Sequence, residues 1–476
     1  MDHYKKALTV YEQVYGDRWE PVQRAVLERK IGEALLRRGK HEQAMEYFCS
    51  ALTHLGRPLP VTRWGIRLGI AKNLWLQVIH RLLSGFFIRR EFVSIGSEAE
   101  EAHQNYELMG WIDFFMNRER MLFYILFGLN EAEKAAHPEL MLKGYVGLGL
   151  VCSTLGWCRW GGGYYRRAND LTERVHNPLL KGFCCLGLGH HEDTLGNWDS
   201  AIRYYQQSGN QYWQVGNVRR WGDPEALTAI LLSKQGKFAE SFAAAQEITR
   251  VGEESGDMQL SGWGAQIQGL NLLYMGLLDG AVICMQKAID LLWEIPDYLV
   301  VGLAKKDLGR CCLRQGKLEK GIALVEESCQ ILAEYKVNTH HDADFYNGLA
   351  EAYLWRVDAV GDDNAAALKS AGPAVRRALK YSKRFKGRLP VAWRLEGLYQ
   401  YFKGKVPAAK KCWQKSIDAA EKTGARYELG ATYLEFGRRC GERSYLEQAR
   451  DIFRETGADF DLAVTNGLLQ EEGVAS

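Results

Sequence analysis

The sequence has few or none of the features that mark membrane, secreted and zinc-binding proteins. It contains no run of about 18 uncharged apolar residues, and its N-terminus lacks the apolar core of a signal peptide. Its 11 cysteines include no Cys-x-x-Cys pair, so we expect neither structural zinc nor a disulfide framework. With only 10 prolines in 476 residues, helices have few interruptions. These absences predict a helical, cytoplasmic protein with reduced cysteines.

The motifs of several enzyme classes are also missing. No G-x-x-x-x-G-K-[ST] phosphate loop and no G-x-S-x-G nucleophile turn occurs. The stretches 147–152 and 187–192 begin like G-x-G-x-x-G but lack its third glycine, and both lie in helical patterns rather than after a strand. We therefore predict that the chain is not an enzyme and binds no cofactor.

Two clusters of histidine and acid come nearest to a metal site. They are His190–Asp193 and His340–Asp344. Neighbouring residues on a helix point about 100° apart, so the two adjacent histidines of a cluster do not easily share a metal ion. His190 and Asp193 lie on one helix face, where an ordinary hydrogen bond is the favoured interpretation. Acids near a helix start favour capping in the second cluster, so we predict no metal.

Charge is nearly balanced over the whole chain but not along it. The net charge is +3, from 61 basic and 58 acidic residues, so the chain as a whole is not a polyanion-binding protein. Thr62–Arg90 has a basic amphipathic pattern, which suits an acidic partner helix or peripheral membrane contact. Arg376–Lys415 holds 13 Lys/Arg against one acid, Glu396, and suits a nucleic acid or another acidic surface. In both stretches an ordinary array helix with a solvated basic face is the favoured interpretation.

What the sequence does contain is a glycine that recurs every 40 residues. A glycine between two helical patterns supplies the left-handed backbone conformation that ends a helix at little cost. A fixed period of roughly 20–50 residues is typical of a solenoid built from one repeated supersecondary unit. The recurring glycines are Gly156, Gly196, Gly236, Gly276 and Gly316.

A second pattern surrounds each turn glycine. An apolar-Gly pair precedes it, and a small, a large and a small residue follow it, as in Leu188-Gly189, Gly196, Ala201, Tyr205, Ser208. Small residues let two helices of a hairpin approach closely, and the large one fills the groove beside them. The pattern resembles the tetratricopeptide repeat (TPR), whose usual period is 34 residues. We therefore predict an all-α, right-handed superhelical solenoid of about eleven TPR-like hairpins, with helices or links longer than usual.

The repeats predict one array over residues 1–476 with four parts. Residues 1–56 hold the first repeats, 57–145 degenerate repeats, and 146–335 the regular ones. Residues 336–476 hold irregular repeats, with an inserted loop expected at 358–373, rich in Ala, Gly and Asp. The small-large-small spacing of a second helix already occurs in the first residues. Either an unusual cap starts the array or the chain continues N-terminally in a longer parent, and the second interpretation is favoured.

The repeat texts resemble the helical-repeat region of large multidomain signalling proteins. They include RKIGEALLRRGKHEQAMEYFCSALTHLGRPLP, GNWDSA, QGKFAES and ARDIFRETGAD. In that family a class III adenylate/guanylate cyclase or kinase domain comes first, a nucleotide-switched ATPase of the AAA/STAND kind follows, and the repeat array comes last. The resemblance implies a sensor and autoinhibitory arm, with the cyclase or ATPase domains as partners in cis. Neither cyclase nor ATPase residues are present in this chain.

We therefore expect a non-catalytic protein-protein interaction scaffold or sensor arm that binds a protein segment on its concave surface. The alternatives are a small-molecule pocket inside the superhelix and nucleic-acid binding through 376–415. Arg219-Arg220-Trp221 offers guanidinium groups beside an indole, although packing of Trp221 is the favoured interpretation. The predicted partner-binding residues are this motif, Arg219, Arg220 and Trp221, together with residues carried over by spacing from the turn glycines: Arg29, Glu33, Arg37, His190, Asp193, Gln266, Lys306, Arg310 and Arg394.

Overall fold

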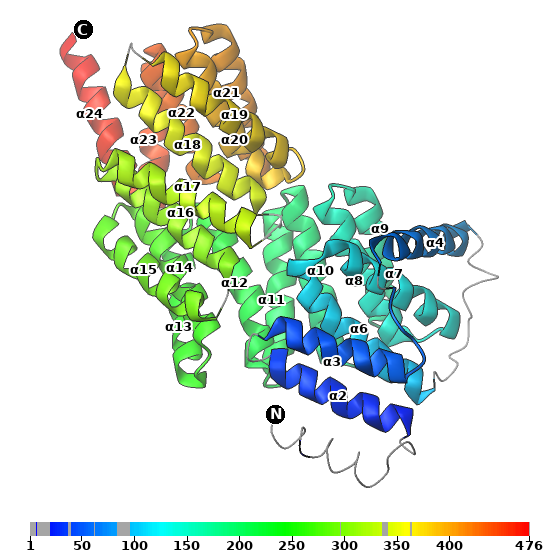
Figure 1. Cartoon of the computed structure of the whole chain (residues 1–476). Helices are drawn as coiled ribbons and strands as arrows, with labels where there is room; N and C mark the ends of the chain where they lie inside the picture. Colours follow the sequence, from blue (N-terminus) through cyan, green and yellow to red (C-terminus); the bar gives the residue numbers. More distant parts are fainter. Residues whose placement is uncertain are drawn as a thin grey trace. The chain divides into compact units, whose positions relative to one another are not determined.

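The computed structural model confirms the all-α, TPR-like fold class. It describes residues 6, 20–36, 40–60, 62–82, 96–295, 297–335, 341–361 and 364–475, without the side chains of 114–116 and 472–475. Within these residues the chain forms 22 α-helices and the short 3₁₀ helix η2, and it forms no strand (Figure 1). The predicted turn at Gly39 lies outside the described residues.

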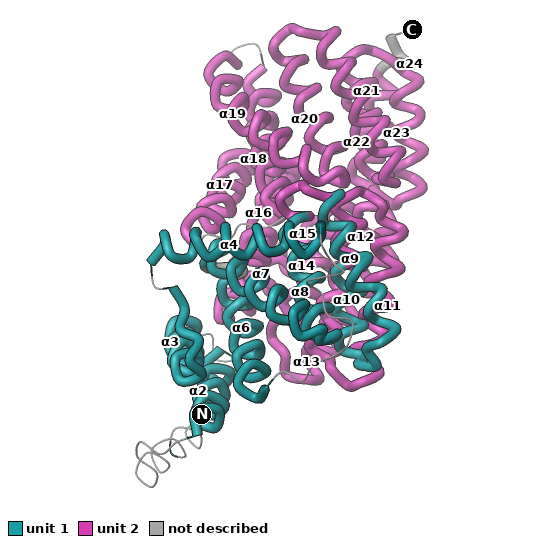
Figure 2. Tube along the Cα trace, turned by 90° about the vertical axis from the view of Figure 1, so that its right-hand side faces the viewer, with its two compact units in different colours: residues 1–152, 159–187 teal, residues 153–158, 188–476 magenta. Residues whose placement is uncertain are grey.

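The chain divides into two compact units, which Figure 2 shows in different colours. Unit 1 comprises residues 1–152 and 159–187, and unit 2 comprises residues 153–158 and 188–476. Three helices have residues in both units: α8 (Pro138–Thr154), α9 (Cys158–Leu171) and α10 (Pro178–Leu195). The other described helices of unit 1 are α2 (Pro21–Leu36), α3 (His41–His54), α4 (Arg63–Leu82), α6 (Ser97–Met116) and α7 (Arg118–Ala135).

Unit 2 is a series of helical hairpins. Its helices are α11 (Trp198–Gln214), α12 (Val218–Lys234), α13 (Phe238–Ser255), α14 (Met258–Met275), α15 (Leu278–Glu294), α16 (Tyr298–Arg314), α17 (Leu318–Glu334), α18 (Asp342–Val360), α19 (Ala365–Ser382), η2 (Lys386–Arg388), α20 (Leu389–Phe402), α21 (Val406–Thr423), α22 (Arg426–Cys440), α23 (Arg443–Thr456) and α24 (Asp459–Ala475). In each hairpin the first helix has an even number and the second the next odd number, from α12 and α13 to α22 and α23.

The recurring glycines adopt the left-handed conformation that the sequence predicts. Their φ angles run from +76° to +84° at Gly156, Gly196, Gly236, Gly276 and Gly316. Gly216 and Gly256 also have positive φ angles, +67° and +68°, in the links between hairpins. The helices from α11 to α14 contain 17 or 18 residues each, which explains a 40-residue period in place of the usual 34.

The small-large-small pattern packs the two helices of a hairpin as predicted. A Cβ placed on Gly189 would lie 2.4 Å from the Tyr205 ring, and one on Gly397 would lie 2.4 Å from Trp413 Nε1. Tyr205 and Trp413 are fully buried. The glycine therefore provides the space that the large side chain of the second helix fills.

The loop predicted at 358–373 is not present, and this prediction is corrected. Helix α18 continues to Val360, and α19 begins at Ala365 and contains Pro373. Alanine is the strongest helix former, and the Ala-rich stretch therefore forms a helix despite its glycine and proline. Part of the extra length before Gly404 lies in the link 383–388, which contains η2.

No helix in the part of the chain that the structure describes is long and apolar enough to cross a membrane.

Candidate functional site

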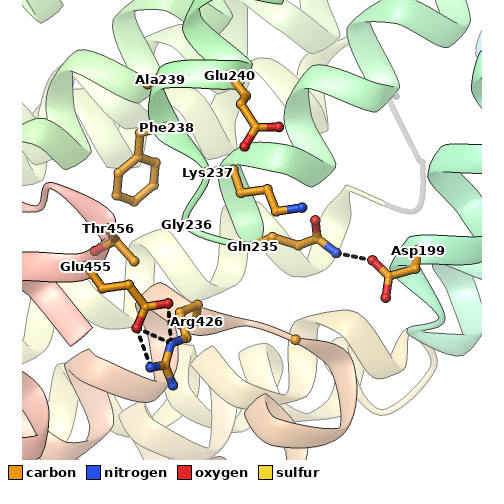
Figure 3. Close-up of a pocket in the computed structure, with 11 residues that line it drawn as sticks. Asp199, Gln235, Gly236, Lys237, Phe238, Ala239, Glu240, Arg426, Glu455 and Thr456 are labelled. Carbon is orange, nitrogen blue, oxygen red and sulfur yellow. Dashed lines mark hydrogen bonds and ion pairs between the residues drawn. The ribbon is translucent and has the colours of Figure 1, made fainter. Parts of the chain in front are cut away.

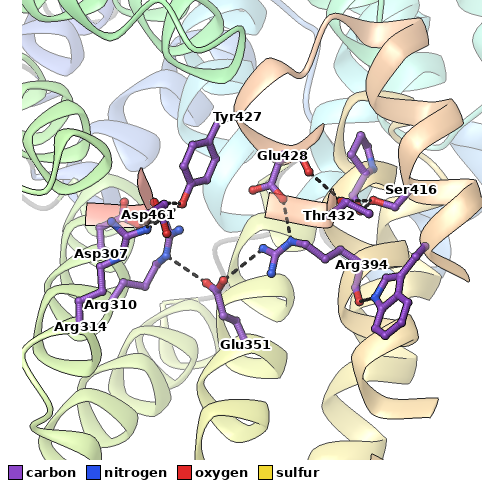
Figure 4. A network of polar contacts seen from close by, with 12 residues as sticks. Asp307, Arg310, Arg314, Glu351, Arg394, Ser416, Tyr427, Glu428, Thr432 and Asp461 are labelled. Atoms are coloured by element: carbon purple, nitrogen blue, oxygen red, sulfur yellow. Dashed lines mark hydrogen bonds and ion pairs between the residues drawn. The ribbon is translucent and has the colours of Figure 1, made fainter. Parts of the chain in front are cut away.

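Charged side chains from alternate helices of unit 2 form one continuous network, which we call the central network (Figure 4). The Glu351 carboxylate on α18 accepts hydrogen bonds from Arg310 Nε on α16 at 3.0 Å and from Arg394 Nη2 on α20 at 3.2 Å. Arg394 Nε donates to Glu428 on α22 at 3.0 Å. Because the signs alternate from helix to helix, the network connects four successive hairpins.

The same network reaches the last helix of the chain. Arg314 Nη2 donates to the Tyr427 hydroxyl at 2.7 Å and to the Asp461 carboxylate on α24 at 2.9 Å. Burial opposes ionisation of Glu351, but the guanidinium groups of Arg310 and Arg394 lower its pKa to about 2. These groups are already paired with one another, so the central network holds the fold together.

A second group of charges, the Lys234 cluster, consists of Lys234, Asp193, Arg388 and Asp344. Arg388 Nη1 donates to Asp193 at 2.7 Å, and Arg388 Nε lies 3.7 Å from Asp344 Oδ2. Lys234 Nζ is buried and makes no hydrogen bond to any residue that the structure describes. Burial, with Arg388 as the next cause, lowers the pKa of Lys234 to about 8. Lys234 is thus a buried cation whose charge is only partly compensated.

Unit 2 also contains a groove of about 480 Å³, the Gly236 groove (Figure 3). It lies where the turn between α12 and α13 meets the turns after α21 and α23, segments that are far apart in the sequence. Gly236 permits the contact, since a Cβ there would lie 2.7 Å from Thr456 Cγ2. Its polar and charged lining includes Asp199, Lys237, Glu240, Arg426, Glu455 and Thr456.

Charges of both signs surround the Gly236 groove. Arg426 Nε donates to Glu455 at 3.0 Å, and Gln235 Nε2 donates to Asp199 at 2.7 Å. The side chains of Lys237 and Glu240 are exposed, and within the described residues neither side chain makes a hydrogen bond or an ion pair. The groove thus presents one cation and one anion to an incoming group, a combination suited to binding a polar segment.

The histidines of the two histidine-acid clusters contact neighbouring side chains. No group of three or more His, Cys, Asp or Glu side chains among them is arranged to hold a metal ion. His341 Nδ1 lies 3.2 Å from Asp344 Oδ2, which matches an ordinary hydrogen bond. His190 Nδ1 lies 3.3 Å from the Tyr205 hydroxyl, and burial lowers the pKa of His190 to about 4. A neutral, partly buried histidine beside a hydroxyl group is a packing arrangement.

Most of the predicted partner-binding residues lie inside the fold. Arg29 is buried and pairs with Glu101 and Glu33, and Asp193 pairs with Arg388 in the Lys234 cluster. Gln266 is buried, Lys306 Nζ lies 3.2 Å from Asp307, and Arg310 and Arg394 belong to the central network. Arg37 lies outside the described residues. None of these residues lines the Gly236 groove, and a role in partner binding stays a prediction.

The Arg219-Arg220-Trp221 motif packs largely as expected. Trp221 is 9% exposed, and its ring centroid lies 5.2 Å from that of Trp213. Arg219 Cζ lies 4.7 Å from the Trp263 ring centroid, and Arg219 Nη2 donates to Gln259 at 2.6 Å. The backbone N–H of Arg220 donates to the Asn217 side chain, which caps α12.

The two basic stretches predicted from the sequence are described by the structure to different extents, and some of their basic residues pair with acids of the same chain. In 376–415, Arg388 and Arg394 are buried in acid pairs, and Lys410 Nζ lies 2.7 Å from Glu442. Only residues 62–82 of Thr62–Arg90 lie within the described residues, and Arg63–Leu82 of these form α4. Ion pairs with acids elsewhere in the fold therefore neutralise part of the positive charge in 376–415.

Sequence reasoning missed the Gly236 groove. Lys237 follows a turn glycine of the 40-residue series, and this is the one local signal that points to it. Arg426 and Glu455 come from distant segments, and no sequence spacing connects them to Gly236.

No protein-family model matches this chain, and no curated protein matches it. Solved structures of helical-repeat proteins resemble it at low sequence identity. A Rap protein complexed with Competence and Sporulation Factor has 11% identity and a TM-score of 0.49, covering 85% of this chain and 97% of that chain. The APC/C hetero-tetramer Cut9-Hcn1 has 14% identity and a TM-score of 0.42, covering 90% and 80%. The human IFIT1 dimer with m7Gppp-AAAA has 14% identity and a TM-score of 0.41, covering 99% and 94%. None of these three is named as a cyclase, kinase or STAND ATPase, so that relationship stays a prediction.

Proposed function

We propose that the chain is a non-catalytic, cytoplasmic protein-interaction module that acts as the sensor arm of a signalling protein. A protein segment binds in the Gly236 groove of unit 2, rather than on the inner helix faces, whose charges are already paired. One observation carries this proposal: the groove combines an exposed cation, Lys237, with walls from four segments that are separated in the sequence.

The charges of the groove favour a protein segment over a nucleic acid. Lys237 and Arg426 are opposed by Asp199, Glu240 and Glu455 within the same lining. A nucleic-acid site needs a clear excess of positive charge along its path, because phosphate contacts supply most of the affinity. An acidic residue of the segment pairs with Lys237, and a basic residue pairs with Glu240.

Binding in this groove supplies a physical means of sensing. A segment that contacts both Lys237 and Arg426 binds more tightly when the turns that carry them are in contact than when they are apart. A ligand shifts a conformational equilibrium only by its difference in affinity for the two states. In a longer signalling protein, this shift is the signal passed to cyclase or ATPase domains in cis.

A small-molecule ligand is the second candidate. The groove volume of about 480 Å³ falls within the range of roughly 300–1,000 Å³ that is usual for ligand pockets. Its mixed charges at turn backbones suit a zwitterionic ligand better than an apolar one.

The experiment selects binders from a random peptide library and measures their affinity by fluorescence polarisation. The test variant is Lys237→Glu, and the matched control is Lys317→Glu, which follows the same Gln-Gly dipeptide at an exposed turn. We expect Lys237→Glu to weaken binding about tenfold or more, whereas the control stays within about twofold. Equal effects of both variants, or the absence of any binder, would overturn the proposed site.

Catalysis is tested separately with the purified chain, MgATP and MgGTP. We expect neither hydrolysis nor cyclisation above a blank. Turnover that is lost on a point substitution in the chain would overturn the non-catalytic assignment. The nucleic-acid alternative would be favoured by two results together. The chain would bind single-stranded RNA as tightly as the selected peptides, and its affinity for the RNA would fall steeply as salt is added.

A further inference from the structure

Helix α4 in unit 1 has a polar face toward the protein and an apolar face toward solvent, the reverse of a usual surface helix. It lies beside α7 (Figure 2). Polar side chains of α4 are buried, while six of its large apolar side chains are exposed. The buried polar residues of α4 are Asn73, Gln77 and His80, and the exposed large apolar residues are Trp64, Leu68, Leu74, Trp75, Val78 and Leu82. Exposed apolar area gathered on one helix face is typical of an interaction surface.

Specific hydrogen bonds fix this orientation of the helix. Asn130 Nδ2 of α7 donates to Asn73 Oδ1 at 2.9 Å, and Gln77 Nε2 donates to Asn130 Oδ1 at 2.7 Å. His80 Nδ1 lies 2.6 Å from the Glu133 carboxylate, which is fully buried. Rotating α4 to bury its apolar face would leave these buried polar groups without partners, at a cost of about 1–3 kcal/mol each. The apolar face is therefore held outward by the fold.

The exposed apolar residues follow the spacing of a coiled coil. Trp64, Leu68, Ala71, Trp75, Val78 and Leu82 succeed one another at alternating steps of four and three residues, and all six are exposed. This stripe has a period of 3.5 residues, the period at which one helix packs along another. We call it the α4 stripe.

Three of the six positions beside the α4 stripe are basic, and the others are Gly65, Leu74 and Ile79. The positions that flank the apolar seam of a coiled coil include Arg67, Lys72 and Arg81 here, and α4 contains no acid. Arg81 pairs with buried Glu133, and Arg67 Nη2 lies 2.9 Å from exposed Glu119. An exposed pair of this kind contributes little, so Arg67 exchanges partners readily, and Lys72 is exposed.

We propose that the α4 stripe docks an amphipathic helix of a partner protein, whose apolar seam packs on the stripe and whose flanking positions are acidic. This interaction is independent of the Gly236 groove. A second copy of α4 does not fit, because two basic flanks would face each other. Residues 1–19 carry three acids and three Lys/Arg, and residues 83–95 carry one acid and two Arg, so neither segment supplies an acidic helix.

The narrow stripe favours a helix over a lipid surface. A helix that lies in a membrane interface buries a broad apolar face with cations around it. In α4 the apolar seam is flanked by Lys72 and Arg67 as well as by Leu74, and the opposite side is occupied by α7. A regular heptad seam fits the knobs-into-holes packing of a second helix.

The test uses two fluorescent synthetic helices of about three heptads, with leucine along the seam and either glutamate or lysine at the flanking positions. One variant of the full chain carries Trp64→Ser, Leu68→Ser and Trp75→Ser, and a second carries Arg67→Glu and Lys72→Glu. The matched control carries Leu277→Ser and Ile283→Ser, which remove exposed apolar groups from unit 2. Circular dichroism checks that every variant retains its helices.

We expect the glutamate helix to bind the full chain at least about tenfold more tightly than the lysine helix. The serine variant loses this binding, the glutamate variant reverses the preference, and both the control and Lys237→Glu bind as the unaltered chain does. Equal binding of the two helices, or none, overturns the proposal. Two other results also overturn it. In the first, phosphatidylserine vesicles bind through the α4 stripe although neither helix binds. In the second, sedimentation shows that the chain is a dimer and that the serine variant is not.

Discussion

Gly236 lies so close to Thr456 that a Cβ on the glycine would approach Thr456 Cγ2 to 2.7 Å. Gly236 has a φ of +79°, so the same residue both ends α12 in the left-handed conformation and admits a distant part of the chain. Gly316 has a φ of +76° within the same Gln-Gly-Lys text, yet nothing lies within 4 Å of a Cβ placed on it. Two turns with the same Gln-Gly-Lys text thus have different tertiary surroundings.

This pair of turns gives the first prediction. Gly316→Ala imposes the strain of a left-handed alanine, about 1–2 kcal/mol, and Gly236→Ala adds a steric conflict of about 1–3 kcal/mol. Urea unfolding followed by circular dichroism should therefore show a larger loss of stability for Gly236→Ala. Equal losses would mean that the contact with Thr456 contributes nothing.

The second prediction concerns the central network. Glu351→Gln leaves Arg310 and Arg394 without their shared carboxylate, and removing one partner of a buried ion pair costs about 3–5 kcal/mol. The matched control is Glu319→Gln, which removes an exposed partner of Arg356 and costs less than about 1 kcal/mol. Urea unfolding at neutral pH measures both. A difference below the error of the measurement would contradict the structural role of Glu351.

Acid dependence supplies a third prediction at the same residue. Because the pKa of Glu351 is lowered to about 2 from an ordinary 4.5, its contribution to stability is fully present above pH 4.5. The contribution is lost as the pH falls from 4.5 toward 2. The stability difference between the unaltered chain and Glu351→Gln should therefore shrink over this range in chemical unfolding. A difference that stays constant would show that Glu351 is not stabilised as an anion.

The fourth prediction concerns Lys234. Its pKa is lowered to about 8 from 10.5 by burial, with Arg388 and Lys306 also lowering it and Asp344 and Asp193 opposing them. Between these two values the unfolded chain binds more protons than the folded one, so the folded state gains stability as the pH rises. Lys234→Met should lack this gain in urea unfolding between about pH 8 and 10.5. Parallel curves for the two proteins would show that Lys234 is fully compensated.

The repeat architecture is predictable from the sequence because its signals are local. A left-handed turn requires glycine, and a close helix pair requires a small residue opposite a large one, so the spacing of Gly189 and Tyr205 alone indicates a hairpin. The helix over 365–373 is missed when glycine and proline are given more weight than alanine. Proline within a helix is uncommon, and here the Ala-rich context prevails.

The sites are less predictable because they depend on contacts between distant repeats. Charges of alternating sign at Arg310, Glu351, Arg394 and Glu428 are visible in the sequence, but only the structure shows that they pair with one another. The same holds for α4, whose basic amphipathic pattern is evident in the sequence. Its outward apolar face follows from hydrogen bonds to Asn130 of α7, which no local pattern predicts.

Charge exchange in the Gly236 groove tests the central proposal most directly. A selected peptide whose acidic residue contacts Lys237 is compared with its lysine-substituted form, each against the unaltered chain and against Lys237→Glu. The account predicts that each change alone weakens binding about tenfold and that the two together restore much of the loss, as expected for a direct ion pair. Additive losses in the doubly changed pair, with no restoration, would contradict binding of the segment at this groove.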